Sequence, residues 1–165
     1  MEIDAYIALG SNVGDRELNL LQAVAALGRL PGCRVTALSR FYVTSPVGMS
    51  ADTPPFYNAV VRLATTRKAP ELLQSLQQIE RKQFGRLPSV SYQSRRMDLD
   101  LLLYGDLSLT TPELTLPHPR MAQRRFVLAP LADIAAELRE PVSGRTIAQL
   151  LAEVRSNEKV RLLEH

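Results

Sequence analysis

Segments in which apolar residues recur at the spacing of a strand alternate along this chain with segments that have the spacing of a helix. The order of these segments is compatible with few folds. Residues 3–9, I-D-A-Y-I-A-L, read as a strand, and Asp15 then precedes apolar residues at helical spacing, as the cap of a helix would. A second helix is expected to open at Pro70 and to end near Gly85. The remaining strands are expected at residues 34–44, 56–66 and 96–104.

This order of elements, β-α-β-β-α-β, matches the split β-α-β arrangement. We therefore expect an α+β fold, a ferredoxin-like βαββαβ sandwich with an antiparallel-dominated sheet and helices packed on its faces. Two more helices are expected near residues 124–136 and 146–155, and the charged tail after Ser156 is expected to fray. The apolar stripe of the first helix is expected to hold Leu18, Leu21, Val24, Ala25 and Leu27.

Length and charge limit the kind of protein further. The chain has 165 residues, so a single domain spanning 1–165 is expected. Its net charge of +3 suits an anionic small ligand better than a nucleic acid. A lone cysteine, Cys33, fits a reducing compartment, and the chain has no run of 18 apolar residues and no N-terminal signal sequence. We expect a cytoplasmic protein, and a monomer as the simplest state for a site made within one chain.

Two acidic residues interrupt the apolar run of the last expected strand. Asp98 and Asp100 stand two positions apart in S-R-R-M-D-L-D-L-L-L-Y-G. Side chains at i and i+2 of a strand point to one face, so the carboxylates share a face while Met97, Leu99 and Leu101 pack into the core. Two such carboxylates would repel each other unless a cation lay between them. Because Mg²⁺ prefers oxygen ligands and completes its shell with water and substrate phosphates, the pair predicts a Mg²⁺–nucleotide site.

An alternative stays open on the aspartates alone, in which both lie on a solvated face and pair with nearby arginines. Other polar residues favour the nucleotide site. The chain has no P-loop motif, so other groups must hold the phosphates, and arginine suits phosphate oxygens. His118, between two prolines in L-P-H-P-R, is a fair phosphate ligand, with a structural role as its alternative. The candidate arginines are Arg86, Arg95, Arg120, Arg124 and Arg125.

Together these motifs resemble the 6-hydroxymethyl-7,8-dihydropterin pyrophosphokinase family of folate biosynthesis. The resemblance runs over nearly the whole chain, in the family's order and at about its spacing. It implies a ferredoxin-like α+β fold and transfer of pyrophosphate from ATP to the hydroxymethyl group of the pterin, with AMP and the pterin diphosphate as products. The motifs that carry it are G-S-N at 10–12, F-Y-V-T-S-P-V-G at 41–48, F-Y-N-A-V-V at 56–61, R-x-x-D-L-D-L-L at 95–102 and L-P-H-P-R-M at 116–121.

The resemblance also implies the metal ions and the ATP contacts. Asp98 and Asp100 are expected to hold two Mg²⁺ ions that bridge the ATP phosphates, one of which also contacts the pterin hydroxyl. Arg86 and Arg95 would contact phosphates and act with the aspartates in catalysis. The other residues on the ATP side are expected to be His118 near the α-phosphate, Arg124 at the far end of the pyrophosphate site, Glu80 near the nucleotide, and Gln77 and Leu101 around adenine.

On the pterin side, the resemblance implies that the side-chain amide of Asn58 reads the ring. Thr44, Ser45 and Val47 would offer backbone groups to the ring edge. Phe56 and Phe126 would stack on the two ring faces, which is a plausible grip for a flat heterocycle. Without the resemblance, these two phenylalanines would be taken as plain core residues.

The chain departs from the family pattern near its aspartates. Members usually read G-P-R before L-D-L-D, whereas this chain reads Q-S-R at 93–95. The loop between Gly85 and Tyr92 is short and carries only Arg86 as a basic residue. In the family this loop closes over ATP, so the departure bears on the turnover rate and leaves a shifted pterin preference open.

Two other functions are weighed against the main expectation. One is a paralogous Mg-ATP pyrophosphokinase that acts on a different pterin or alcohol. The other is a non-enzymatic ferredoxin-like nucleic-acid-binding module, which would call for exposed aromatic residues on its strands and a stronger positive charge. We therefore expect ATP and 6-hydroxymethyl-7,8-dihydropterin as partners, and neither nucleic acid nor a membrane.

Overall fold

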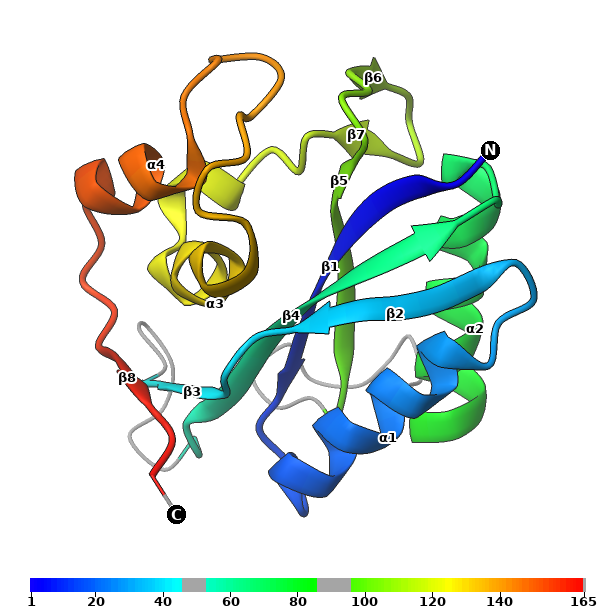
Figure 1. Cartoon of the computed structure of the whole chain (residues 1–165). Helices are drawn as coiled ribbons and strands as arrows, with labels where there is room; N and C mark the ends of the chain where they lie inside the picture. The colour runs from blue at the N-terminus through cyan, green and yellow to red at the C-terminus, as the bar shows by residue number, and fades with distance from the viewer. Residues whose placement is uncertain (46–52, 86–95, 165) are drawn as a thin grey trace.

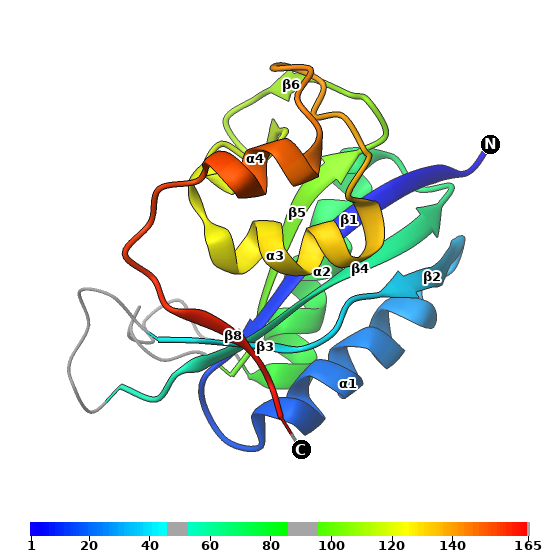
Figure 2. The ribbon, with the colours of Figure 1, turned by 60° about the vertical axis from the view of Figure 1, so that its left-hand side comes forward.

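A computed structural model describes residues 1–45, 53–85 and 96–164, and shows a six-stranded sheet with helices on both faces (Figure 1, Figure 2). A separate two-stranded ribbon follows the last long strand. The elements are β1 (Ile3–Ser11), α1 (Arg16–Gly28), β2 (Cys33–Leu38), β3 (Tyr42–Thr44), β4 (Phe56–Thr65), α2 (Ala69–Phe84), β5 (Asp98–Tyr104), β6 (Leu109–Thr110), β7 (Thr115–Leu116), a 3₁₀ turn (Met121–Gln123), α3 (Arg125–Ala135), α4 (Ile147–Glu153) and β8 (Val160–Leu162).

The strand order confirms the expected α+β class. β1 lies between β4 and β5, β4 also pairs with β2 and β3, and β8 pairs with β3. Every one of these pairings is antiparallel. The four strands expected from the sequence therefore lie in an order that is compatible with a ferredoxin-like βαββαβ arrangement.

The two faces of the sheet bury separate apolar clusters. α1 and α2 cover one face, where Ile7 and Leu9 of β1 are almost fully buried. α3 and α4 lie over the other face, where the cluster includes Tyr6 of β1 and Val60 of β4. Because side chains alternate along a strand, the next residue of β1 on the α3 face after Ala8 is Gly10, which lies beyond that cluster.

The first helix confirms one expectation and corrects another. The Asp15 carboxylate caps α1 by accepting a hydrogen bond of 3.1 Å from the Leu18 N–H. The expected apolar stripe is wrong in part, because Leu18 and Leu21 are 47% and 48% exposed. Apolar residues occur almost all round this helix, so their spacing alone did not fix which face packs on the sheet. The residues it buries are Asn19, Leu20, Ala23, Ala26 and Leu27.

The single strand expected at 34–44 is interrupted. Between Leu38 and Tyr42 lie three residues, 39–41, whereas between their partners Val61 and Asn58 in β4 lie only two, 59–60. An extra residue on one strand breaks the regular ladder in the manner of a β-bulge. The Ser39 hydroxyl accepts a hydrogen bond from the Val60 N–H at 2.9 Å and so satisfies β4 at the break.

The tail is also more ordered than expected. Fraying was expected after Ser156, but residues 160–162 form β8 on the outer side of β3. Charged side chains favour solvent without preventing a backbone ladder, since an edge strand can keep its side chains exposed. The tail therefore belongs to the sheet.

Replacing Leu99 with alanine is expected to destabilise the fold. Leu99 is 5% exposed and packs in the apolar cluster beneath α1 and α2. Met97 and Leu101 pack in the same cluster, as predicted for all three residues. Loss of the buried side chain should lower the free energy of unfolding by about 2–5 kcal/mol. Urea unfolding of both proteins checks this, and a loss well below that range would mean that the site repacks or that Leu99 is not a core residue.

Candidate active site

One residue expected to hold metal, Asp98, and the residue expected to read the pterin, Asn58, lie in one row across the sheet. Asn58 of β4 is the register partner of Gly10 in β1, and Gly10 is the partner of Asp98 in β5. Side chains in such a row project to one face, here the face that α3 partly covers. Neighbouring strands are about 4.8 Å apart, so the backbones of Asn58 and Asp98 are about 10 Å apart, which suits a small heterocyclic substrate.

Gly10 provides the floor between them. A methyl group at Gly10 would stand 3.1 Å from Nδ2 of Asn58 and 3.6 Å from Cδ1 of Phe56. The absence of a side chain therefore lets the amide and the ring converge over β1. The G-S-N motif did not predict this role, although a glycine inside a strand often marks the close approach of another group.

The two aspartates share a face, as strand periodicity predicts. Asp98 and Asp100 are half-buried, and their partners in β1 are Gly10 and Ala8, which have no polar side chain. Within residues 1–45, 53–85 and 96–164, no group of three or more His, Cys, Asp or Glu side chains forms a metal site. The pair thus supplies two carboxylates. A Mg²⁺ ion bound with a nucleotide fits such a donor set, because water and phosphate oxygens commonly complete its shell.

Glu80 of α2 holds the backbone between the two aspartates. Its carboxylate Oε2 accepts a hydrogen bond of 2.8 Å from the Leu99 N–H, and the side chain is buried. β5 is an edge strand, and this N–H lies on the side away from β1. The contact makes Glu80 a positioning residue for Asp98 and Asp100. A direct contact of Glu80 with ATP stays a prediction.

Replacing Glu80 with alanine should disturb both stability and turnover. The Leu99 N–H would lose this acceptor, at a cost of about 1–3 kcal/mol in the free energy of unfolding. Turnover should fall by roughly 10–100-fold, because the aspartates would lose a support on their own strand. Glu80→Gln keeps an acceptor oxygen and should recover most of both. Urea unfolding and steady-state kinetics test this; a stability loss with unchanged turnover would show that Glu80 supports only the fold.

His118 lies beside the aspartate strand. The backbone N–H of His118 donates to the Leu102 carbonyl at 2.9 Å. Its ring Nδ1 accepts a hydrogen bond from the Arg120 backbone N–H at 3.2 Å. With Nδ1 as acceptor, a neutral imidazole carries its proton on Nε2. Burial lowers the pKa of His118, the charge of Asp100 opposes this, and Arg124 and Arg120 add to the lowering. The neutral ring can therefore donate from Nε2 to a phosphate oxygen.

Arg124 and Phe126 flank the start of α3. The Arg124 guanidinium lies 5.5 Å from the centroid of the Phe126 ring. Arg124 also acts electrostatically on His118, so the structure brings these three residues to one region together with Asp100. Phe126 is half-buried rather than a plain core residue, and so is Phe56 at the start of β4. Stacking of the two rings on a pterin stays a prediction.

The Asn58 amide is held in one orientation. The Thr44 hydroxyl donates to Asn58 Oδ1 at 2.7 Å, and both residues are buried. This leaves the amide Nδ2, on the side of Gly10, as the donor that faces the floor of the site. The Ser45 N–H donates to the Lys159 carbonyl at 3.1 Å, so a backbone contact of Ser45 with the pterin stays a prediction that would involve its carbonyl.

The residues expected around adenine lie at the edge formed by α2 and β5. Gln77 is exposed on α2, whereas the Leu101 side chain is 3% exposed and packs in the core. Leu101 has the same strand parity as Leu99, so its backbone groups also lie on the outer side of β5. Val47, Arg86 and Arg95, and the Q-S-R departure at 93–95, lie outside the described residues.

Two residues that were not expected in the site anchor the chain before Phe56. The Arg16 guanidinium donates to the Pro55 carbonyl at 2.8 Å and lies 4.0 Å from the Tyr57 ring centroid. The Asn12 amide donates to the Pro54 carbonyl at 3.3 Å, and Asn12 is 1% exposed. Both contacts join segments about 40 positions apart, which local sequence patterns do not reveal.

The sequence of this chain is similar to a known protein family and to named proteins. A family model described as 7,8-dihydro-6-hydroxymethylpterin-pyrophosphokinase (HPPK) matches residues 6–136. The chain is 46% identical over 143 residues to the 2-amino-4-hydroxy-6-hydroxymethyldihydropteridine pyrophosphokinase of Bacillus subtilis (strain 168), covering 86% of this chain and 84% of the relative. The Pseudomonas aeruginosa protein of the same name is 44% identical over 147 residues, 89% of each chain.

The fold has a counterpart among solved structures. Wild-type Plasmodium falciparum HPPK-DHPS superposes with a TM-score of 0.73 at 15% sequence identity. The match covers 93% of this chain and 45% of that longer chain, and it shows similarity of fold. The residues that the family model matches include the whole row of Asn58, Gly10 and Asp98, and they end before α4 and β8.

Proposed function

The chain belongs to the 7,8-dihydro-6-hydroxymethylpterin-pyrophosphokinase family, and from this premise we propose how its residues bind the two substrates. Its activity is the transfer of pyrophosphate from ATP to the hydroxymethyl group of 6-hydroxymethyl-7,8-dihydropterin, in folate biosynthesis. A non-enzymatic nucleic-acid-binding module does not agree with this membership.

In the proposed reaction, the pterin hydroxymethyl oxygen attacks the β-phosphorus of ATP. The bond between that phosphorus and the oxygen that bridges to the α-phosphate breaks, so AMP leaves and the pterin keeps the β- and γ-phosphoryl groups. The hydroxyl proton passes to solvent water in the same step. Since the protein forms no covalent bond, its part is to position both substrates and to balance the negative charge that develops.

We propose that Asp98 and Asp100 hold two Mg²⁺ ions with the ATP phosphates. When bound, Mg²⁺ would supply positive charge to the attacking and leaving oxygens and help to align them. The proposal is supported by the shared face of the two carboxylates and by their pairing in register with the small residues Gly10 and Ala8 of β1. Glu80 keeps the strand between the carboxylates in place.

The other described residues divide between the phosphates and the ring. His118 would donate its Nε2 proton to a phosphate oxygen, and the Arg124 charge would balance the far end of the pyrophosphate. Asn58 would donate from Nδ2 to the pterin, with its amide held by Thr44. Phe56 and Phe126 would contact the ring faces, while Gln77 and the Leu101 backbone would border adenine.

The observation that carries this proposal is the row in which Asn58 and Asp98 flank Gly10 on one face of the sheet. Such a row would present a hydrogen-bonding amide to the heterocycle and, two strands away, Asp98 of the metal-binding pair to the phosphates. An end-point assay with ATP, Mg²⁺ and 6-hydroxymethyl-7,8-dihydropterin tests it by separating AMP from ADP. Pterin-dependent AMP is expected. ADP, or no AMP in the presence of bound ATP, would contradict it.

The same proposal extends to the whole chain and its partners. We infer a single domain over residues 1–165, because β8 pairs with β3 and joins the tail to the main sheet. A monomer, and a reducing cytoplasmic compartment suggested by the lone Cys33, stay predictions. Among the described residues, no helix is both long and apolar enough to cross a membrane.

A further inference from the structure

The C-terminal strap, residues 154–163, is tied to two walls of the proposed pterin site. It runs from the end of α4 to β8 and lies outside the residues that the family model matches. Figure 1 and Figure 2 show it passing from α4 to the outer side of β3. It therefore connects the helical layer to the sheet at the end where Thr44 and Ser45 are found.

At its first end the strap is held by one side chain. The Arg125 guanidinium donates to three backbone carbonyls of the strap, those of Val154 at 3.2 Å, Ser156 at 3.4 Å and Glu158 at 3.4 Å. Arg125 stands between Arg124 and Phe126 at the start of α3. A charged donor that serves three carbonyls fixes the path of residues 154–159, the part of the strap that has no secondary structure of its own.

At its second end the strap pairs with β3. The Ser45 N–H donates to the Lys159 carbonyl at 3.1 Å, and the Leu163 N–H donates to the Phe41 carbonyl at 2.9 Å. Between these two bonds, Thr44 is the register partner of Val160. The strap therefore fixes both flanks of β3, including the residue whose hydroxyl orients the Asn58 amide.

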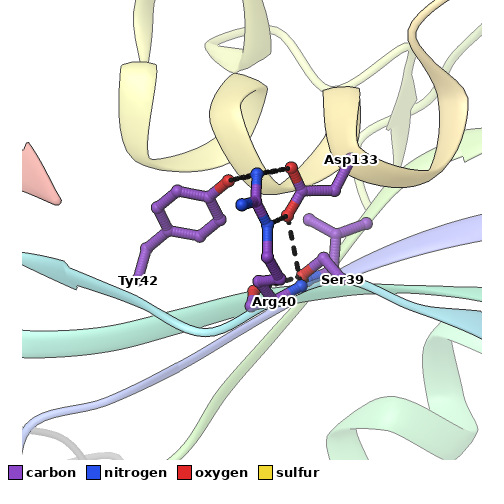
Figure 3. Close-up of polar contacts among 5 residues, drawn as sticks. Ser39, Arg40, Tyr42 and Asp133 are labelled. Carbon is purple, nitrogen blue, oxygen red and sulfur yellow. Dashed lines mark hydrogen bonds and ion pairs between the residues drawn. The ribbon is translucent and has the colours of Figure 1, made fainter. Parts of the chain in front are cut away.

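A second group of hydrogen bonds and an ion pair joins α3 to β3. Asp133 of α3 accepts from the Tyr42 hydroxyl at 2.9 Å and from the Arg40 guanidinium at 2.9 and 3.2 Å (Figure 3). Burial acts to raise the pKa of Asp133, but the hydrogen bonds from Arg40 and Tyr42 outweigh it and keep the pKa below its ordinary value. α3 and β3 are thus joined at two separate points, by this charged cluster and by the strap.

We propose that the C-terminal strap is a positioning element that holds the Phe126 wall of the pterin site against the Thr44 wall. The proposal rests on the proposed function, because it needs Phe126 and Thr44 to line the pterin site. The charged cluster at Asp133 fixes one end of α3, and the strap fixes the other end, next to Phe126. Without the strap, the first turn of α3 would lose the three carbonyl contacts of Arg125.

Two variants release the strap at its opposite ends in the full-length enzyme. Arg125→Met removes the donors to three carbonyls and keeps an apolar stem. Leu163→Pro removes the N–H that bonds to Phe41. The matched controls are Arg139→Met, which removes an arginine bond of 2.8 Å to the Gly144 carbonyl elsewhere, and Glu164→Pro, which places a proline just beyond the strap.

Each strap variant should raise KM for the pterin by about tenfold, while KM for ATP stays within about twofold. The double variant should be no worse than about the stronger single variant, since both release one element. Arg125→Lys should restore part of the pterin KM. The controls should match the wild type, and melting temperatures should separate these effects from general destabilisation.

Three outcomes with the strap variants would overturn the proposal. A change in Arg125→Met alone would mean a local effect on Phe126, and equal rises in both KM values with a lowered melting temperature would mean a purely structural strap. Wild-type pterin KM in both strap variants would also overturn it. Asn58→Ala serves as the reference for the site: an unchanged pterin KM there would show that the assigned pterin site is wrong, and the strap proposal would fall with it.

Discussion

Replacing Asp100 with alanine is expected to lower kcat by at least about a thousandfold while the free energy of unfolding changes little. The carboxylate stands on a half-buried position opposite Ala8, so the fold does not depend on it for core packing. Its loss should remove a metal ligand, and metal stabilisation of phosphoryl oxygens is worth several kcal/mol, of which about 4 corresponds to a thousandfold in rate.

The measurement is a turnover assay at saturating ATP, pterin and Mg²⁺, with urea unfolding in parallel. Asp106→Ala is a suitable control, because Asp106 is an exposed aspartate in the turn just after β5. Asp100→Asn keeps the shape of the side chain and should lose nearly as much activity as alanine, since a neutral amide is a poor Mg²⁺ ligand. An Asp100→Ala enzyme that turns over at the wild-type rate, or that does not fold, would contradict the proposed role.

The order of elements and the side of β5 on which the aspartates lie were predictable from local sequence. Both follow from periodicities that the chain shows within single elements, such as the period of two in D-L-D. The burial of Met97, Leu99 and Leu101 behind the aspartates confirms that reasoning. Periodicity was less informative for α1, where apolar residues on several sides of the helix allow more than one buried face.

Features that depend on distant partners were not predictable in the same way. The break at 39–41 exists because β4 pairs with both β2 and β3 in different registers. β8 forms because β3 offers a free outer edge, which the tail's own charged sequence does not encode. Arg16 and Asn12 reach carbonyls about 40 positions away, so their roles required the tertiary structure.

The contacts within the site also depend on partners that are distant in the sequence. The family resemblance predicts which residues serve ATP and the pterin, whereas the contacts among these residues came from the structure. The Glu80 carboxylate accepts a hydrogen bond from the Leu99 N–H, and the Ser45 N–H donates to the Lys159 carbonyl. Both findings concern backbone donors, whose partners no side-chain pattern specifies.

Asn58→Ala should lower kcat/KM for the pterin by roughly 10–100-fold and leave KM for ATP unchanged. The variant removes the Nδ2 donor that faces the floor over Gly10, and it also leaves the Thr44 hydroxyl without the Asn58 oxygen. In this variant the polar edge of the pterin would face an apolar alanine side chain without a hydrogen-bond donor. The loss in kcat/KM should therefore concern the pterin and not ATP.

Thr44→Val separates the two parts of this effect. It keeps the Asn58 amide but removes the hydroxyl that holds its Oδ1, so the loss in kcat/KM should be smaller, about fivefold. Kinetics with pterin varied at saturating ATP, then with ATP varied at saturating pterin, measure both variants. If Asn58→Ala raised KM for ATP as much as KM for the pterin, the row across β4, β1 and β5 would not divide the substrates as proposed, and Asn58 would be a residue of general site architecture.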